Sequence, residues 1–526
     1  MAGATVTRMD GSADGSIDGP IDGSVEALPD GHVDALGDGS SAAPATAAPA
    51  TAAPATTPLA TTPLATGDLG SLQALAGELR AAFATGVTRP LAWRREQLNA
   101  VTTMLREGSS SLVEAMAEDM GKPATEAWLT DVAAIWRDVE AMARDLARWA
   151  APRRVRVPWQ LWPSRAEVVP EPLGTVLVMG PWNYPVRCVV LPLASALAAG
   201  DTVAAKPSEL APTTAAELAR LAKKYLDEDA VRFCLGGPDV AQGLLDQPWD
   251  HVFFTGSGRV GRLVMAAAAR HLTPVTLELG GKNPALVAAS ADVRSAARRI
   301  VWGKFFNAGQ TCVAPDYVVV EREAESALLE EIKHWLAHFY GDNPYLSPDF
   351  GRIVNDVHVA RLATLLAATK ARTVTGGEVL TGERYVAPTL LAGVSWDDPV
   401  MDEEIFGPVL PVLACDDIAS VLGEIRRRDK PLAVYLYARD RELVERVLAE
   451  TSSGGVCINH NTVQLAVSGL PFGGVGASGM GAYHGKASFD TFSHQKAVMR
   501  QPAGAEIPLM YPPYGKLKQW LLRKVV

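Results

Sequence analysis

Apolar runs typical of strands alternate with helical stretches between residues 173 and 280, and this alternation restricts the chain to few folds. The strand-like runs are 175–179, 202–205, 252–254 and 275–279. Helical spacing fills the intervals, at 191–199, 213–225 and 260–270. Such alternation favours an α/β fold with a parallel sheet that carries helices on both faces. Ligands of these sheets bind beyond the carboxyl ends of the strands. The residues after each strand are therefore the place to look for a function.

A second α/β unit is expected after residue 280. Its predicted strands are 285–287, 317–320, 409–413 and 433–437, with a helix at 324–339. Ahead of the first unit, helical stripes run through 71–150, and two strand-like runs around a Pro/Trp turn predict a hairpin within 153–170. We therefore expect three folded segments, at 71–280, 281–460 and 461–526.

Low-complexity sequence precedes the first unit. Residues 10–41 repeat with an acidic residue at every fourth position, and 43–66 repeat Pro, Ala and Thr. This composition predicts a disordered tail over 1–70, with a calcium-binding Asp-Gly array or a docking segment as the alternative. At the other end, 516–524 is basic and amphipathic. That pattern is typical of a helix packed on the surface, or of one attached weakly to a membrane face.

Charge and cysteine content exclude several classes of protein. The net charge is −10, and residues 1–70 hold nine acidic residues and one basic residue of that total. The remaining chain is near neutral and has no basic stripe for nucleic acid. Its cysteines are Cys188, Cys234, Cys312, Cys415 and Cys457. An odd number without a CxxC pair argues against a disulfide framework or a zinc site and favours a reducing, cytoplasmic compartment. No apolar run reaches the ~18 residues of a membrane span, and no signal peptide is evident.

Polar residues follow the first two strands. After the first, the Asn183 amide could donate to an oxyanion, although a turn stabilised by Pro and Asn explains the same residues. After the second, Lys206 and Glu209 suit the hydroxyls of a ribose, and Ser208 could equally cap a helix.

Polar residues also follow the third and fourth strands. Gly256, Ser257 and Gly261 open a helix, where glycine lets the backbone approach a phosphate. The pattern differs from the usual dinucleotide fingerprint and is a weak signal on its own. Glu278 ends an apolar strand, where an unpaired carboxylate has a raised pKa and suits a general base. Pairing with a nearby Lys would instead make it structural.

Cys312 lies in a connection, 307–315, between a helical pattern at 293–301 and the strand expected at 317–320. Reactive side chains occur in such loops because the scaffold on both sides is rigid. A lone cysteine is more often a small core residue. The case for a nucleophile therefore depends on which other groups converge on Cys312.

Taken together, these motifs resemble those of the aldehyde dehydrogenases. The matching stretches are LELGGKNP around Glu278, NAGQTC around Cys312, PWNYP around Asn183, KPSE around Lys206, FTGS around Gly256 and EEIFGPV around Glu404. The stretches PFGGVGASGMGAYHGK and FDTFSH are similar to the class 3 branch, as is RAAFATGVTRPLAWRREQL. The resemblance covers about 71–515 and leaves out the repetitive tail. The C-terminus lacks the long apolar tail of the branch's membrane-anchored members, so no stable anchor is expected.

The resemblance implies a fold and an activity. The fold would be aldehyde dehydrogenase-like, with a Rossmann-type parallel-sheet cofactor domain at 71–280 and a second α/β catalytic domain at 281–460. A β-hairpin and the C-terminal segment, 461–526, would form an oligomerisation arm of a homodimer. The activity would be the NAD(P)-dependent oxidation of an aldehyde to the carboxylic acid, without a metal.

The resemblance also implies roles for individual residues. Cys312 would form a thiohemiacetal and then a thioester, Asn183 would hold the oxyanion, and Glu278 would activate water. The cofactor would be bound by Lys206, Glu209, Gly256, Ser257, Gly261, Glu404 and Phe406. Glu209 favours NAD because it repels a 2′-phosphate, but the branch often accepts both cofactors, so NADP stays open.

The identity of the aldehyde is less constrained. Trp182 and Tyr184 suggest a medium or long aliphatic, or an aromatic, substrate. Two alternatives remain. A CoA-acylating semialdehyde dehydrogenase is disfavoured by Glu278, because that reaction needs no water-activating base. A non-catalytic family member that acts as a binding protein is the other.

Overall fold

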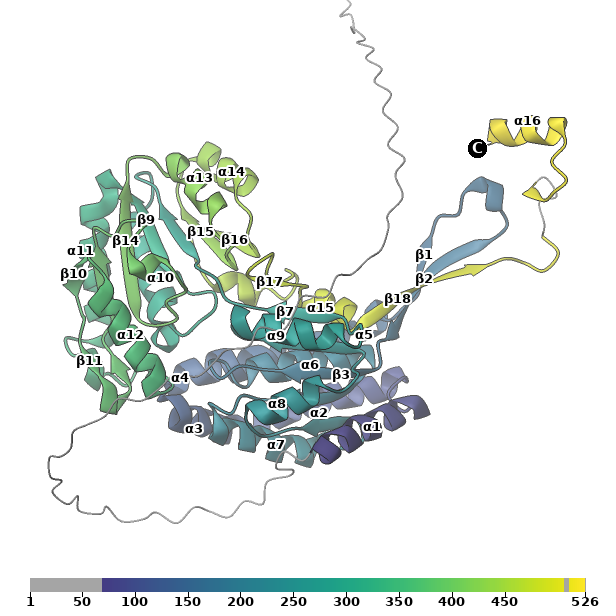
Figure 1. The fold of residues 1–526 in the computed structure, drawn as a ribbon, viewed down its shortest axis with the longest axis horizontal. Helices are drawn as coiled ribbons and strands as arrows, with labels where there is room; N and C mark the ends of the chain where they lie inside the picture. Colours follow the sequence, from purple (N-terminus) through teal and green to yellow (C-terminus); the bar gives the residue numbers. More distant parts are fainter. Residues whose placement is uncertain (1–68, 506–509, 526) are drawn as a thin grey trace, which may run out of the picture. The chain divides into compact units, whose positions relative to one another are not determined.

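The computed structural model describes residues 69–505 and 510–525 (Figure 1). Most of the predicted tail, residues 1–68, lies outside this range, and α1 (Leu69–Thr85) begins where the range begins. A six-stranded sheet has the order β17-β7-β6-β3-β4-β5. Its strands are β3 (Thr175–Met179), β4 (Thr202–Lys206), β5 (Val231–Phe233), β6 (His251–Thr255), β7 (Val275–Glu278) and β17 (Gly479–Met480). Neighbours are parallel except β17, which is antiparallel to β7.

Side chains of this sheet alternate between two layers of helices. Val176 and Val178 of β3 pack with one layer, and Leu177 and Met179 with the other. The first layer contains α2 (Leu91–Glu107), α3 (Ser109–Met120), α5 (Ala134–Trp149), α6 (Arg187–Ala199), α7 (Pro212–Tyr225) and α15 (Gly485–Thr491). The second contains α1, α8 (Pro238–Leu245) and α9 (Gly258–Ala269). Because successive strand residues point to opposite faces, strands buried on both sides read as continuous apolar runs. The predicted α/β class is confirmed.

Helix α6 begins earlier than predicted. The predicted helical stretch was 191–199, but the helix begins at Arg187, and Pro192 lies within it. A proline inside a helix removes a backbone hydrogen bond and costs ~3 kcal/mol. Residues 188–199 are all buried, so their burial offsets this loss. The early start places Arg187 directly after the segment that carries Asn183.

The second α/β unit contains a seven-stranded sheet with the order β10-β13-β14-β9-β8-β15-β16. Its strands are β8 (Pro284–Val287), β9 (Tyr317–Glu321), β10 (Arg372–Thr375), β13 (Thr389–Ala392), β14 (Val409–Cys415), β15 (Ala433–Tyr437) and β16 (Gly455–Ile458). The helices that pack on it are α10 (Val293–Phe305), α11 (Arg322–Tyr340), α12 (Asp356–Ala368), α13 (Ile418–Arg427) and α14 (Arg441–Glu450). The four predicted strands are confirmed. Strands β10, β13 and β16 were not predicted, nor was β5 in the first sheet.

Smaller elements complete the described chain. The predicted hairpin is formed by β1 (Arg153–Val155) and β2 (Arg165–Pro172), and β18 (Ser493–Arg500) pairs with β2 along its length (Figure 1). The remaining elements are β11 (Val379–Leu380), β12 (Tyr385–Val386), α4 (Ala124–Ala127), the π-helical η1 (Trp128–Ala133) and the short helices η2 (Trp159–Leu161), η3 (Phe306–Gly309), η4 (Pro344–Leu346), η5 (Thr381–Glu383), η6 (Pro399–Met401) and η7 (Val463–Ala466).

The basic C-terminal stretch is a helix, α16 (Lys516–Val525). Its Leu517 and Trp520 are 71% and 52% exposed, so its apolar side chains remain open to solvent or to a partner. Among the described residues, helices that combine the length and the apolar character of a membrane span are absent.

Candidate functional site

The carboxyl ends of the four predicted strands lie level in the six-stranded sheet. Met179 of β3 stands beside Lys206 of β4 and Phe254 of β6, and Thr255 of β6 stands beside Glu278 of β7. The strand order reverses between β3 and β6. At such a switch point, the connections leave the sheet in opposite directions and open a crevice for a ligand. The segments with Asn183, Gly256 and Glu278 start at this edge.

Glu278 is the last residue of β7 and is 2% exposed. Neither carboxylate oxygen has a hydrogen-bond partner among the described residues. Burial raises the pKa of Glu278 well above its ordinary value. Unsatisfied buried carboxylates are unfavourable and are retained where a reaction needs them. The structure therefore gives Glu278 the environment of a base rather than that of a structural Glu paired with Lys.

Cys312 follows the turn after α10 and is partly exposed. Burial in the surrounding protein raises the pKa of its thiol well above the ordinary value, and negative charge on Glu404 or Glu278 raises it further. Both carboxylates therefore lie within electrostatic range of the sulfur. The thiol is the resting form, and a thiolate arises only when a nearby base takes the proton.

A strained turn and an amide clamp fix the backbone around Cys312. Asn307 and Ala308 have φ of 51° each, and Gly309 has φ of 76°. A Cβ at Gly309 would lie 2.3 Å from the Gly407 carbonyl oxygen, so only glycine fits. The Asn283 amide donates to the Cys312 carbonyl at 2.8 Å and to the Ala314 carbonyl at 3.0 Å.

Asn183 and Tyr184 join the β3 edge to the Cys312 loop. The Asn183 amide donates to the Gln310 carbonyl at 3.0 Å. The Tyr184 hydroxyl lies 2.7 Å from Oγ1 of Thr311. Because an amide nitrogen has two N–H groups, the second one of Asn183 can still bind an oxyanion.

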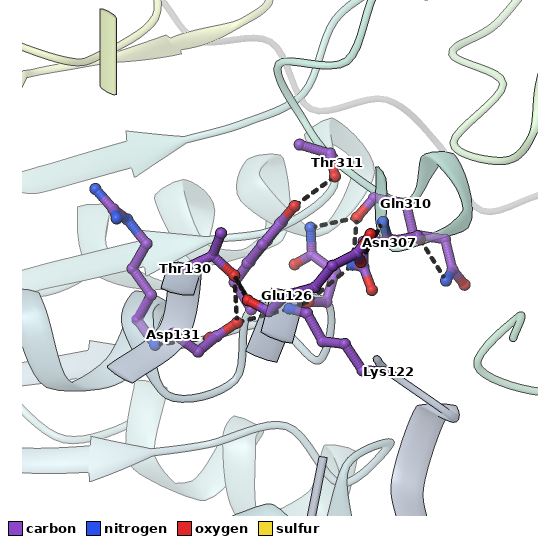
Figure 2. A network of polar contacts seen from close by, with 10 residues as sticks. Lys122, Glu126, Thr130, Asp131, Asn307, Gln310 and Thr311 are labelled. Atoms are coloured by element: carbon purple, nitrogen blue, oxygen red, sulfur yellow. Dashed lines mark hydrogen bonds and ion pairs between the residues drawn. The ribbon is translucent and has the colours of Figure 1, made fainter. Parts of the chain in front are cut away.

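Figure 2 shows a buried polar network that sequence analysis missed. Lys122 and Asp131 form a fully buried ion pair of 2.6 Å. The Lys122 ammonium also donates to the Asn183 carbonyl at 3.3 Å and lies 3.9 Å from the centre of the Tyr184 ring. A buried charge pair of this kind is far apart from the motifs in sequence, and no local pattern marks it.

A second arm of the network reaches the strained turn. Glu126 accepts the backbone N–H of Asn307 at 3.0 Å (Figure 2). Burial raises the pKa of Glu126 to about 7, and the hydrogen bond from Asn307 opposes that shift. The Asn307 side chain donates to the carbonyls of Asn183 and Gln310 at 3.0 and 3.2 Å. The segments that carry Asn183 and Cys312 thus share one set of buried partners.

Residues suited to a dinucleotide lie along the same sheet edge. Lys206 donates to Glu209 at 3.0 Å, and Ser257 caps α9 by accepting the Val260 N–H at 3.4 Å. A Cβ at Gly256 would lie 2.5 Å from the Phe254 ring, and one at Gly261 would lie 2.8 Å from Leu279. These glycines keep the loop and the start of α9 close to the sheet, as a phosphate-binding turn requires.

Glu404 and Phe406 approach this edge from the second α/β unit. A Cβ at Gly280 would lie 2.1 Å from a Glu404 carboxylate oxygen, so glycine there leaves room for the carboxylate. Burial, with the charge of Asp316, raises the pKa of Glu404 to about 8. The Phe406 ring meets the edge of Trp182 at 5.5 Å. Trp182 therefore faces the Phe406 loop, whereas Tyr184 faces the Cys312 loop.

Comparison with known proteins assigns the chain to a family. The sequence model of the aldehyde dehydrogenase family matches residues 46–498, so the match begins earlier than the expected 71 and ends before 515. A mouse (Mus musculus) aldehyde dehydrogenase, family 3 member B3, is 44% identical over 447 residues, which are 85% of this chain and 93% of that protein. Family 3 member H1 of Arabidopsis thaliana is 44% identical over 462 residues, 87% and 96% of the two chains.

Solved structures agree. A substrate-bound Staphylococcus aureus AldH has a TM-score of 0.84 at 40% identity and covers 86% of this chain and 99% of its own. An NADP-dependent enzyme of E. coli has a TM-score of 0.76 at 27% identity, over 82% and 90% of the chains. An NAD-dependent aldehyde dehydrogenase of Sinorhizobium meliloti has a TM-score of 0.78 at 27% identity, and the match covers 84% of this chain and 89% of that one. The chain thus belongs to the aldehyde dehydrogenase family, resembles its class 3 members, and is an NAD(P)-dependent oxidoreductase that converts aldehydes to carboxylic acids.

Proposed function

We propose that Cys312 is the nucleophile of this reaction, with Asn183 and Glu278 as its partners. The observation that carries the proposal is the buried, unpartnered carboxylate of Glu278 within electrostatic range of the Cys312 thiol. Burial raises the pKa of both groups, and a carboxylate beside the thiol is placed to accept the proton of the sulfur. The thiolate then attacks the aldehyde carbon, and a C–S bond forms.

Asn183 and the backbone N–H of Cys312 would bind the oxygen that becomes negative in this attack. The support is the hydrogen bond from Asn183 to Gln310, which holds the amide beside the loop. Donors fixed before the reaction stabilise the developing charge without reorganisation. Lys122 and Asn307 hold the Asn183 backbone from the other side.

Glu278 would also act in the second half of the reaction. Once it has released the first proton to solvent, Glu278 takes a proton from water, the water oxygen adds to the thioester carbon, and the C–S bond breaks to release the carboxylic acid and the Cys312 thiolate. Burial favours this role, since a raised pKa makes the carboxylate a stronger base. One carboxylate would thus serve two proton transfers.

The cofactor-binding residues would be Lys206 and Glu209 at the adenosine ribose, and Glu404 with Phe406 at the nicotinamide ribose. Gly256, Ser257 and Gly261 would lie along the pyrophosphate. When bound, NAD or NADP supplies the acceptor for the hydride of the aldehyde carbon. The side chain of Glu209 is 40% exposed at the ribose position, and its charge would disfavour a 2′-phosphate.

The test is a comparison of two cysteine variants. Cys312→Ala removes the nucleophile and should abolish NAD(P)H formation with aldehydes, measured by absorbance on purified protein. Cys457 is the other partly exposed free cysteine, and Cys457→Ala is the matched control that should retain activity. Substantial turnover by Cys312→Ala would defeat the assignment.

For the substrate, we favour medium or long aliphatic and aromatic aldehydes. The support is Trp182, whose ring packs with the Phe406 ring, and Tyr184, whose hydroxyl lies beside Thr311. A panel of aldehydes of graded length with NAD and NADP tests it, and faster turnover of small charged semialdehydes would contradict it. Addition of CoA to the assay tests which molecule accepts the acyl group. Formation of a CoA ester instead of the free acid would show that CoA is the acceptor, and Glu278 would then not be needed to activate water.

For the assembly, we favour a cytoplasmic homodimer built on the β1–β2 hairpin and β18. The support is that β18 joins β2 over eight residue pairs and leaves a small sheet with an open edge. The proposed domains are 71–280 for the cofactor and 281–460 for catalysis; five strands of the six-stranded sheet and all of the seven-stranded sheet support this division. Light scattering of the full chain and of a chain ending at 492 would test the dimer. If both chains have the same number of subunits, β18 has no role in assembly.

A further inference from the structure

Arg187, the first residue of α6, holds a half-buried guanidinium without a carboxylate at ion-pair distance among the described residues. Its Nη2 donates over 3.5 Å to the Leu465 carbonyl and lies 3.5 Å from Nε2 of His484. Both partners are uncharged, because burial lowers the pKa of His484 well below its ordinary value and the Arg187 charge lowers it further. A guanidinium taken from water without a counter-charge is unfavourable, and a carboxylate is its best partner.

The two acidic side chains near Arg187 leave its charge available. Asp131 accepts the backbone N–H of Arg187 at 3.1 Å, but its own counter-ion is Lys122 at 2.6 Å. Burial raises the pKa of Asp138, and the charge of Arg187 and a hydrogen bond from Ser468 oppose that shift, but the two side chains form no ion pair among the described residues. A guanidinium has five N–H donors in a planar fork, so Arg187 keeps donors for another anion.

Hydrogen bonds link this cluster to the proposed site, because Asp131 accepts the Arg187 backbone N–H and pairs with Lys122, which donates to the Asn183 carbonyl. Cys188, the next residue, is near enough for its charge to raise the pKa of Cys312. Tyr483, the neighbour of His484, lies within range of Cys312, Glu278 and Arg187. The guanidinium contacts η7 of the C-terminal return, whereas the proposed cofactor residues follow β4 and β6 or lie at 404–406. Arg187 is therefore placed to meet the aldehyde rather than the dinucleotide.

Arg187 also connects two segments with exposed apolar side chains. Its backbone bonds to η1 and its guanidinium to η7. Trp128 and Leu129 of η1 are 41% and 47% exposed, and Val463 of η7 is 36% exposed. The two segments that Arg187 connects thus combine exposed apolar side chains with a cationic group. That combination matches an amphiphilic anion.

We propose that Arg187 binds a carboxylate at the far end of the aldehyde, so that the preferred substrates are oxo acids with an apolar chain between aldehyde and carboxylate. The proposal rests on the function assigned to Cys312 and narrows its substrate class. The oxidation yields a dicarboxylic acid and needs no reactant beyond water and the nicotinamide cofactor. Arg187 acts on specificity and takes no part in bond making.

Paired substrates test the inference. The ratio of kcat/KM for 9-oxononanoate to that for nonanal is measured with saturating NAD, and a series of shorter pairs locates the best chain length. Wild-type protein should favour the oxo acid. Arg187→Met should lower this ratio roughly tenfold to hundredfold, as expected for loss of a charged hydrogen bond, mainly through the KM of the oxo acid. Arg187→Lys should restore part of the ratio because it keeps the charge.

A binding measurement removes the dependence on turnover. Nonanedioate, the dicarboxylate product, should bind Cys312→Ala by calorimetry and bind the Cys312→Ala, Arg187→Met double variant at least tenfold more weakly. Two results would overturn the inference while the proposed function stands. One is that the wild type prefers the simple aldehyde over the oxo acid at every chain length. The other is that Arg187→Met leaves the kcat/KM ratio of oxo acid to aldehyde unchanged. Failure of the proposed function looks different, because Cys312→Ala would then still oxidise both substrates.

Discussion

Loss of the Lys122 ammonium should destabilise the protein by several kcal/mol. In Lys122→Met the Asp131 carboxylate stays fully buried. It keeps the backbone N–H of Arg187 at 3.1 Å and the long contact with the Thr130 hydroxyl at 3.4 Å, but has no cation. Removal of one partner of a buried pair costs ~3–5 kcal/mol. Because one good donor remains, we expect the lower end, about 3 kcal/mol.

The assay is the free energy of unfolding from urea titration, with two comparisons. Arg106→Met breaks an ion pair with Glu140 in which both side chains are at least 40% exposed, and it should cost no more than ~1 kcal/mol. Lys122→Met with Asp131→Leu replaces the buried pair by apolar groups and should recover most of the stability. The reasoning is refuted if Lys122→Met unfolds like Arg106→Met, or if the double variant is no more stable than the single one.

Turnover should not recover with stability. Lys122 also holds the Asn183 carbonyl and the Tyr184 ring, and the apolar pair supplies neither contact. The double variant should therefore fold well and still show a lower kcat with benzaldehyde. Equal recovery of kcat and stability would show that Lys122 has no role in placing Asn183.

Three further variants probe the proposed site. Asn183→Ala should lower kcat about a hundredfold or more, because one oxyanion donor is worth ~3 kcal/mol; a loss below threefold would remove Asn183 from that role. Glu278→Gln should slow both the first turnover of NADH and the steady rate, because the amide accepts neither the Cys312 proton nor the proton of water. The wild-type steady-state rate should rise with pH, since only the ionised carboxylate of Glu278 accepts a proton and burial raises its pKa. The Gln variant should not show this rise. If it does, the rise belongs to another group. Glu209→Gln should increase the kcat/KM ratio of NADP to NAD, and an unchanged ratio would place the 2′-hydroxyl elsewhere.

The sequence predicts the elements whose apolar pattern is dense. Strand β3 was predicted at its observed bounds because all five of its residues are buried. Strand β10 was missed because its exposed arginine and threonines give no apolar alternation. The start of α6 was missed because the predicted stretch began at 191, whereas the helix begins at Arg187 and is buried from 188 to 199. Local patterns therefore fail where tertiary contacts decide.

The same distinction applies to the site. The residues after the strands could be predicted because the carboxyl ends of parallel strands meet at one edge. The Lys122–Asp131 pair, Glu126 and Arg187 could not, since each depends on which side chains the fold brings together. Asn283 was inside a recognised motif, but its hydrogen bonds to the carbonyls of Cys312 and Ala314 became visible only in the structure.

The pairing of Gly479 with Glu278 has a consequence for biosynthesis. Translation delivers the strand with the proposed base long before it delivers β17. Until the ribosome has released residue 480, β7 is the outermost strand of its sheet, with free amide and carbonyl groups along one side. An exposed strand edge of this kind can pair with other nascent chains. Early termination before β17 should thus yield aggregated polypeptide rather than a smaller soluble enzyme.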